Sequence, residues 1–328
     1  MRSISKRLAT AVAMMGTALT GMALSGAAFA QSAAEEAGAV YGRGVPGQLN
    51  MQEPVTQVGR QVVDLHNMML LIMTGISVFV LILLLIVIFR FNKKANPTPA
   101  TWTHNTRLEM VWTFAPVLIL FVIAVPSFKL LVLQEDFENV KPDVVIKATG
   151  YQWYWGYEYT ESGAAGEPEE AEAIGFDSYM IGLDYAEMTS ELEAELAEYG
   201  HTPDLWKLAA DNPMVVPVDK TVLIQTTGAD VIHSWTVPSF GVKADSVPNR
   251  LNQTWFHAER VGDYYGQCSE LCGRYHAYMP INVKVVSQGA YDNWVACVRE
   301  TEEPYECTKT MNDGVQVSKA GVDGVAIR

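Results

Sequence analysis

The segment Cys268-Ser-Glu270-Leu-Cys272-Gly-Arg-Tyr-His276-Ala-Tyr-Met279 brings two thiols, an imidazole and a thioether into one short stretch of chain. Thiolate and thioether sulfur select copper over magnesium or calcium, and imidazole suits copper equally well. A mononuclear blue-copper site uses a single thiolate, so the second thiol needs a second metal or another explanation. The alternatives are a disulfide between Cys268 and Cys272, a zinc site, or ordinary surface and core residues.

The sequence around this loop predicts a β-sandwich, because short runs rich in Val, Ile, Thr, Tyr and Trp alternate with Gly, Pro, Asn and Asp. The predicted strands are 144–149, 214–218, 221–226, 251–256 and 281–286. The loop stands immediately before the last strand. His233 follows another strand, and a sandwich could bring it to the loop as a further ligand. Alone, beside Trp235, His233 would be read as a packed core imidazole.

Two apolar runs predict a transmembrane helical hairpin. Met68 to Phe89 has no charge and is long enough, at about 1.5 Å per residue, to cross a hydrocarbon core of about 30 Å. Met110 to Phe128 is a second run, and membrane helices tolerate its two prolines. The loop between the runs is basic, which predicts a cytoplasmic loop with both termini outside. The basic residues are Arg90, Lys93, Lys94 and Arg107. A buried soluble hairpin is the alternative.

The first thirty residues have the three parts of a cleavable signal peptide, ending in the small-x-small site Ala28-Phe-Ala30. The net charge of the chain is −14, and loss of a signal with three basic and no acidic residues would make the mature chain more acidic still. Nucleic acid is therefore excluded as an expected partner, and a basic protein is favoured.

The expected layout has five parts. They are a signal peptide (1–30), a periplasmic N-terminal segment (31–65), the hairpin (66–135), the β domain (141–288) and a C-terminal tail (289–328). An acidic insertion at about 161–206 interrupts the strands, and its charge is most simply a solvated face. Ser190 and Glu193 predict a capping box and a helix there. The tail is expected to start as a short helix after Asp292 and to end without regular structure. Cys297 and Cys307 either pair, which is favoured, or stay free.

Four segments carry a resemblance to a known family. They are Gly150-Tyr-Gln-Trp153-Tyr-Trp-Gly-Tyr-Glu-Tyr159, Asp230-Val-Ile-His233-Ser-Trp-Thr-Val-Pro238, Tyr265-Gly-Gln-Cys268-Ser-Glu-Leu-Cys272-Gly273 and His276-Ala-Tyr-Met279-Pro280. From the first membrane helix to about Gln288 the chain resembles subunit II of bacterial aa3-type haem–copper cytochrome c oxidases. The resemblance implies a cupredoxin-like Greek-key sandwich holding the dinuclear copper A centre.

Within that resemblance, Cys268 and Cys272 would bridge two copper ions. His233 and Met279 would complete one copper, and His276 with the backbone carbonyl of Glu270 the other. The Glu270 side chain is similar to one that helps bind a magnesium ion shared with subunit I. The segment with Lys243, Asp245 and Arg250 is similar to one that abuts the haem propionates. Asn249 replaces the usual glycine of a Pro-Gly-Arg turn, and Asn tolerates the same left-handed backbone.

The resemblance also implies routes for electrons and protons. Trp153 is similar to the indole at which cytochrome c docks and delivers its electron. The alternative is that Trp153 is an ordinary structural residue of an aromatic-rich strand. Acids that attract the lysine-rich face of a soluble or membrane-anchored cytochrome c are expected at Glu158, Asp177, Asp211 and Asp230. Glu109 resembles the carboxylate at the mouth of the K proton pathway, although the helix dipole alone favours an acid in a first turn.

The expected function is therefore electron transfer from cytochrome c through copper A to haem in subunit I, where oxygen is reduced and protons are pumped. The expected location is a bacterial inner membrane, in a complex with subunit I and subunit III. No Cys-x-x-Cys-His motif is present, so a fused c-type haem domain is not expected. The alternatives are a copper-free quinol oxidase subunit II, against which the intact ligands argue, and the copper domain of a nitrous oxide reductase, which needs a large additional catalytic domain.

Overall fold

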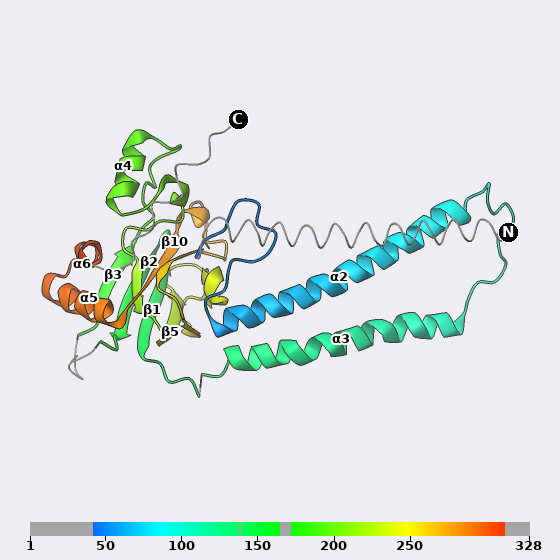
Figure 1. Cartoon of the computed structure of the whole chain (residues 1–328), viewed down its shortest axis with the longest axis horizontal. Helices are drawn as coiled ribbons and strands as arrows, with labels where there is room; N and C mark the ends of the chain where they lie inside the picture. Colours follow the sequence, from blue (N-terminus) through cyan, green and yellow to red (C-terminus); the bar gives the residue numbers. More distant parts are fainter. Residues whose placement is uncertain (1–41, 138, 165–171, 312–328) are drawn as a thin grey trace.

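The computed structural model describes residues 42–137, 139–164 and 172–311. The predicted signal peptide, part of the N-terminal segment, part of the acidic insertion and the last part of the tail lie outside these residues. Within them, a helical hairpin extends from one end of a β domain (Figure 1).

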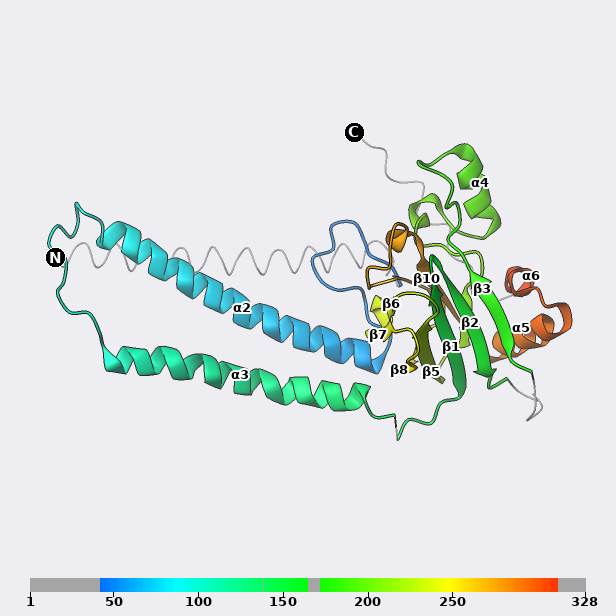
Figure 2. The ribbon, with the colours of Figure 1, turned by 180° about the vertical axis from the view of Figure 1, so that it is seen from behind.

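The hairpin consists of α2 (Gln57–Arg90) and α3 (Thr106–Gln134), which run alongside each other in both views (Figure 2). The connection between them lies at the end far from the β domain. Both helices are long and apolar enough to span a membrane, and their most apolar windows are 0% and 6% buried. A soluble core hairpin would bury these side chains, so that alternative does not fit and the prediction of a transmembrane hairpin does.

The β domain contains ten strands in the described residues, and all five predicted strands are among them. The strands are β1 (Val144–Tyr151), β2 (Tyr154–Glu161), β3 (Ile174–Ser178), β4 (Met214–Pro217), β5 (Thr221–Gly228), β6 (His233–Val237), β7 (Val242–Ser246), β8 (Asn252–His257), β9 (Gly262–Gln267) and β10 (Pro280–Val286). They form a sheet of order β3-β2-β1-β5-β8, a sheet of order β4-β10-β9, and the β6-β7 pair.

One hydrophobic core joins the sheets, as expected for a sandwich. Alternate residues of β5 point inward, and Val222 and Ile224 are fully buried. Trp235 of β6 packs in the same core as Met214 of β4 and Ile281 of β10. The β-sandwich predicted from the sequence is therefore confirmed, and the α-helices of the described β domain and tail lie in the insertion and the tail.

The acidic insertion contributes β3, helix α4 (Ser190–Glu198) and the short helix η1 (Pro203–Leu205). The predicted helix is present, but the predicted capping box of Ser190 and Glu193 is wrong: the N-cap is Thr189, whose hydroxyl accepts from the Leu192 N–H at 3.2 Å. Leu192 and Leu196 are fully buried in a satellite core that also contains Tyr265 of β9. The apolar side of α4 thus packs into this satellite core, and its charged side faces away from it. The core fixes the insertion to β9, the strand that leads to Cys268.

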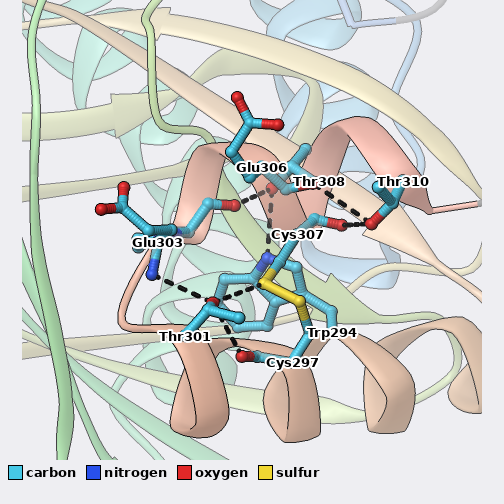
Figure 3. The surroundings of a disulfide bond; sticks show 9 residues. Trp294, Cys297, Thr301, Glu303, Glu306, Cys307, Thr308 and Thr310 are labelled. Carbon is cyan, nitrogen blue, oxygen red and sulfur yellow. Dashed lines mark hydrogen bonds between the residues drawn. A yellow bond between two sulfur atoms is a disulfide. The ribbon is translucent and has the colours of Figure 1, made fainter.

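The tail begins as α5 (Gln288–Thr301), a few residues earlier than predicted, and continues as α6 (Pro304–Thr310). Cys297 and Cys307 form a disulfide between these helices, which confirms the favoured alternative (Figure 3). The Trp294 indole donates to the Thr308 hydroxyl at 3.1 Å beside the disulfide. In α6, the Tyr305 ring lies 4.4 Å from that of Tyr199, at the end of α4. The cross-linked tail therefore braces the insertion.

Replacing Cys297 and Cys307 together by alanine should lower the free energy of unfolding by about 2–3 kcal/mol, because the cross-link restricts the unfolded chain over a short loop. Denaturant unfolding of the detergent-solubilised chain, followed by tryptophan fluorescence, measures this change. Reduction of the wild-type disulfide is the matched control and should give the same shift. Unchanged unfolding midpoints in both samples would contradict the expectation.

Candidate metal centre

The ligand loop is held at both ends by strand pairing. Gln267 of β9 lies opposite Pro280 of β10 in antiparallel register, so residues 268–279 form the connection between two hydrogen-bonded strands. The loop is also tied to β6, because the Ser269 N–H donates to the Ser234 carbonyl at 3.0 Å. Ser234 follows His233 directly. The fold therefore delivers His233 to the loop from a different pair of strands.

The donor atoms predicted from the sequence converge on the two thiols. The Cys268 Sγ lies 3.9 Å from the Cys272 Sγ and 3.9 Å from the His233 Nδ1. The Glu270 carbonyl oxygen is 3.3 Å from the Cys268 Sγ. On the other side of the pair, the Cys272 Sγ lies 3.5 Å from the His276 Nδ1 and 3.4 Å from the Met279 Sδ. All six predicted ligands thus border one small volume.

The centre of this cluster is buried, whereas its outer edge is open. His233 is 0% exposed, Cys268 6%, Cys272 3% and Met279 1%. His276 is half-buried, and Glu270 is exposed. A group held between the two thiols would be shielded from water except on the side of His276 and Glu270.

The thiol pair is not a disulfide, because sulfur atoms 3.9 Å apart are not bonded. Burial opposes ionisation of Cys268, but hydrogen bonds from His233 and the backbone outweigh it and lower the pKa of this thiol. Burial and the neighbouring Cys268 thiolate raise the pKa of Cys272 to about 12. The protein alone therefore stabilises one thiolate and resists a second, and bound cations would remove that penalty.

The donor set fits copper better than the alternatives weighed from the sequence. Metal–thiolate bonds of about 2.3 Å could join one metal to two sulfurs at the observed separation. Three sulfur donors, two imidazoles and a carbonyl exceed the four ligands of a closed zinc site. Soft sulfur with imidazole is the ligand type that copper takes. His233, Cys268 and Cys272 alone already form a group whose ligand atoms lie within 4.8 Å of one another.

Two side chains outside the ligand set support the candidate ligands: Asp230, which was expected only as a docking acid, and Gln152, which was not predicted. The Asp230 Oδ1 lies 2.9 Å from the His233 Nε2, and its Oδ2 accepts from the Gln152 N–H at 2.8 Å. The Gln152 side chain donates to the Cys272 carbonyl at 2.7 Å. Because Asp230 holds Nε2, the His233 Nδ1 is left to face the thiols.

Gly150 is a second missed residue, and its role is steric. A Cβ at this position in β1 would lie 2.7 Å from the His233 ring. Glycine inside a strand often marks such a close approach, so the sequence did carry a signal. The sequence alone could not show that the residue packed against Gly150 is His233.

Trp153 lies directly against the ligand loop. Its indole N–H donates to the Cys272 carbonyl at 3.3 Å, and its ring meets that of Tyr275 edge-on with centroids 5.0 Å apart. It is only partly buried. Trp153 therefore lies between the surface and the cluster of candidate ligands, in the turn between β1 and β2 and not within a strand.

The four predicted docking acids do not form one equivalent set. Asp177 is exposed in β3, and Glu158 pairs with Lys147 at 3.1 Å on the neighbouring strand. Asp211 accepts from the backbone N–H groups of Tyr179 and Asn212, and burial raises its pKa. Asp230 bonds His233. Only Asp177 and Glu158 present carboxylates that are not committed to internal backbone or ligand contacts.

The other predicted residues lie outside the cluster. Glu109 is in the first turn of α3, where its side chain accepts from the Asn105 N–H at 3.3 Å, so it has a capping role. Lys243, Asp245 and Arg250 are exposed. Asn249 has a φ of 62°, which confirms the left-handed turn expected there.

A transmembrane hairpin carrying a β-sandwich with a buried cluster of thiol, imidazole and thioether groups defines a membrane-anchored protein with a candidate metal centre. Residues 44–130 match the family model for the transmembrane domain of cytochrome c oxidase subunit II, and residues 144–286 match the model for its periplasmic domain. The chain belongs to the cytochrome c oxidase subunit II family and is thus part of a haem–copper oxidoreductase complex.

Individual relatives agree. The chain is 47% identical to cytochrome c oxidase subunit 2 of Cereibacter sphaeroides, over 82% of this chain and 86% of the relative. It is 43% identical to the subunit 2 of Oenothera berteroana, over 76% and 90% of the two chains. Among solved structures, the periplasmic domain of subunit II from Bradyrhizobium japonicum is 43% identical, with a TM-score of 0.39 over 49% of this chain and 96% of that chain.

Asp230→Asn should change the environment of His233, because an amide is a weaker acceptor than a carboxylate and removes a charge from the ligand network. We expect a shifted reduction potential and a shifted absorption spectrum of the copper-loaded protein. Asp177→Asn is the matched control, since it removes the same charge from an exposed position, and it should leave both unchanged. Identical spectra and potentials in the two variants would show that Asp230 acts only as a surface charge.

Proposed function

We propose that this chain accepts electrons one at a time from cytochrome c at a dinuclear copper A centre and passes them to haem in subunit I. The observation that carries the proposal is the pair of unbonded thiols 3.9 Å apart, with two imidazole nitrogens, a thioether and a carbonyl beside them. One buried thiol would suffice for a mononuclear copper protein, and two favour a dinuclear centre.

The proposed ligands divide as the family resemblance implies. Cys268 and Cys272 would serve both metals, His233 and Met279 would complete one, and His276 with the Glu270 carbonyl would complete the other. Two copper ions held in this way would supply a one-electron couple in which the charge is shared over both metals. The chain's part is to keep the donors in fixed positions, which two loops on paired strands and the Asp230 contact to His233 favour.

Electrons would arrive through Trp153. Its indole is partly exposed and donates a hydrogen bond to the Cys272 carbonyl, so it offers a direct route from the surface to the backbone of a proposed ligand. Asp177 and Glu158 would attract a basic cytochrome c to this face. Asp211 and Asp230 add negative charge there, although their hydrogen bonds give them structural roles as well.

The proposal extends to topology and partners. The signal peptide (1–30) is removed, the N-terminal segment (31–65), the copper domain (141–288) and the tail (289–328) lie in the periplasm, and the hairpin (66–135) crosses the bacterial inner membrane. Subunits I and III are neighbours. The exposed Glu270 side chain would help bind magnesium at the contact with subunit I. Oxygen reduction and proton pumping occur in the complex, not in this chain alone.

Changing Cys268 or Cys272 to serine should abolish the electron paramagnetic resonance signal of one electron shared over two copper nuclei, because a bridging ligand is lost. The hairpin should still insert in the membrane. Met279→Leu is the milder comparison, since it removes a weak ligand at nearly constant volume. A serine variant that retained the shared-electron signal would refute the dinuclear centre, and a wild-type protein that never bound copper would favour a quinol oxidase subunit.

Trp153→Ala should slow electron transfer from cytochrome c much more than it weakens binding, because the indole links the surface to the Cys272 carbonyl. Association itself should slow as salt shortens the Debye length from about 10 Å at 0.1 M. Stopped-flow reduction at several ionic strengths separates the two effects. Normal electron transfer in the alanine variant, or salt-independent association, would exclude this docking face.

We also assign Glu109 to proton uptake at the cytoplasmic end of α3. Glu109→Gln keeps an acceptor for the Asn105 N–H but cannot change its protonation state. Reduction of the haem–copper site in subunit I should therefore slow, while copper spectra and cytochrome c binding stay unchanged. Wild-type turnover in this variant would leave Glu109 with its capping role alone.

A further inference from the structure

The first turn of α2 is built into the β domain rather than linked to it by a free loop. Val55 belongs to the main hydrophobic core. Its N–H donates to the Ser239 carbonyl at 3.0 Å, and its carbonyl accepts from the Glu259 N–H at 3.0 Å. Two separate segments of the sandwich thus hold the residue that lies just before the N-cap of α2.

Thr56 joins the helix to the sandwich with a single hydroxyl. The Thr56 Oγ1 accepts from the Gly59 N–H at 2.8 Å as the N-cap of α2, and it donates to the Phe240 carbonyl at 2.7 Å. The residue is 1% exposed. The same oxygen therefore starts the membrane helix and fixes it to η2 (Pro238–Phe240), the short helix after β6.

Two glycines bring the backbones of the two parts into contact. A Cβ at Gly241 would lie 2.5 Å from the Gly59 Cα, and Gly241 has a φ of 69°. Arg60 adds a bidentate ion pair with Glu259, at 2.8 and 2.7 Å. This pair is substantially exposed, so it fixes orientation more than it stabilises. Residues 55–60 therefore form a rigid joint between α2 and the β domain.

The joint is continuous with the metal centre. η2 follows β6, whose first residue is the ligand His233, and the next carbonyl, that of Ser234, accepts from the ligand loop. A tilt of α2 at η2 would therefore move the metal centre relative to the membrane. The connection through α3 constrains the β domain less, because Leu130 is the one residue of that helix that is buried among the described residues.

We propose that Thr56, Gly59 and Arg60 are positioning residues, which hold the metal domain at a fixed height and tilt above the membrane. The proposal rests on the proposed function, because electron transfer to haem in subunit I falls off exponentially with distance. If the β domain could hinge on α2, the distance from the metal centre to the haem would vary over a range. A rigid joint keeps this distance constant. The membrane hairpin is then a mounting for the metal centre as well as an anchor.

The test uses the full chain in the assembled oxidase with nitroxide labels at Asp64 in α2 and Glu300 in α5, so that the distance readout does not depend on copper. Thr56→Val removes the shared hydroxyl at similar size, and Thr56→Ser restores it. Gly59→Ala adds a Cβ that would lie 3.0 Å from Pro54 Cβ and Thr56 Oγ1. Gly75→Ala is its control in the same helix, because nothing lies within 4 Å of that Cβ.

We expect Thr56→Val and Gly59→Ala to broaden the label–label distance distribution and to slow electron transfer from copper to haem several-fold, with the copper spectrum unchanged. Thr56→Ser and Gly75→Ala should match the wild type. Wild-type distance distributions in Thr56→Val and Gly59→Ala would refute the proposal that these residues hold the metal domain in place. Broadened distances in a protein without a copper A signal would instead support the joint and refute the proposed function.

Discussion

The cluster of candidate metal ligands depends on backbone hydrogen bonds that fix two segments from different strand pairs against each other. The β9–β10 ladder closes the ligand loop, and the Ser269–Ser234 bond locks that loop to the strand that starts with His233. Without these bonds the thiols would have no reason to stay 3.9 Å apart, since burial and the neighbouring Cys268 thiolate raise the pKa of Cys272 to about 12 and so oppose two negative charges at this place. The fold therefore imposes a geometry that the side chains alone would not adopt.

The same backbone frame explains why the support behind the ligands is polar and not purely apolar. Asp230 and Gln152 satisfy the His233 ring and the Cys272 carbonyl, and Trp153 shares that carbonyl. A buried imidazole and a turn carbonyl without partners would each cost free energy. Because one carboxylate serves both the ligand and the turn that carries Trp153, the surface proposed for docking and the metal cluster belong to one hydrogen-bond network.

Much of this could be predicted from the sequence, for identifiable reasons. The membrane helices follow from uncharged length, and five strands follow from β-branched runs bounded by turn residues. The capping residue of α4 was misplaced because Thr189 and Ser190 are chemically equivalent candidates, and only the backbone decides between them. Gln152, Gly150 and the internal bonds of Asp230 and Asp211 were not predicted, because each depends on a partner far away in sequence.

The tail and the insertion form a second structural unit that ends at the ligand loop. The disulfide sets α6 against α5, and the Tyr305 hydroxyl donates to the Glu198 carbonyl at the end of α4. The satellite core under α4 contains Tyr265, three residues before Cys268. Next to this core, the Gln267 side chain donates to the Lys207 carbonyl. β10 pairs with β9, and β6 holds the ligand loop through Ser234. The unit formed by the tail and the insertion adds a third set of contacts to β9, through Tyr265 and Gln267. The apolar face of the acidic insertion therefore supports the strand that carries the candidate ligand Cys268, and this role does not depend on its charged face.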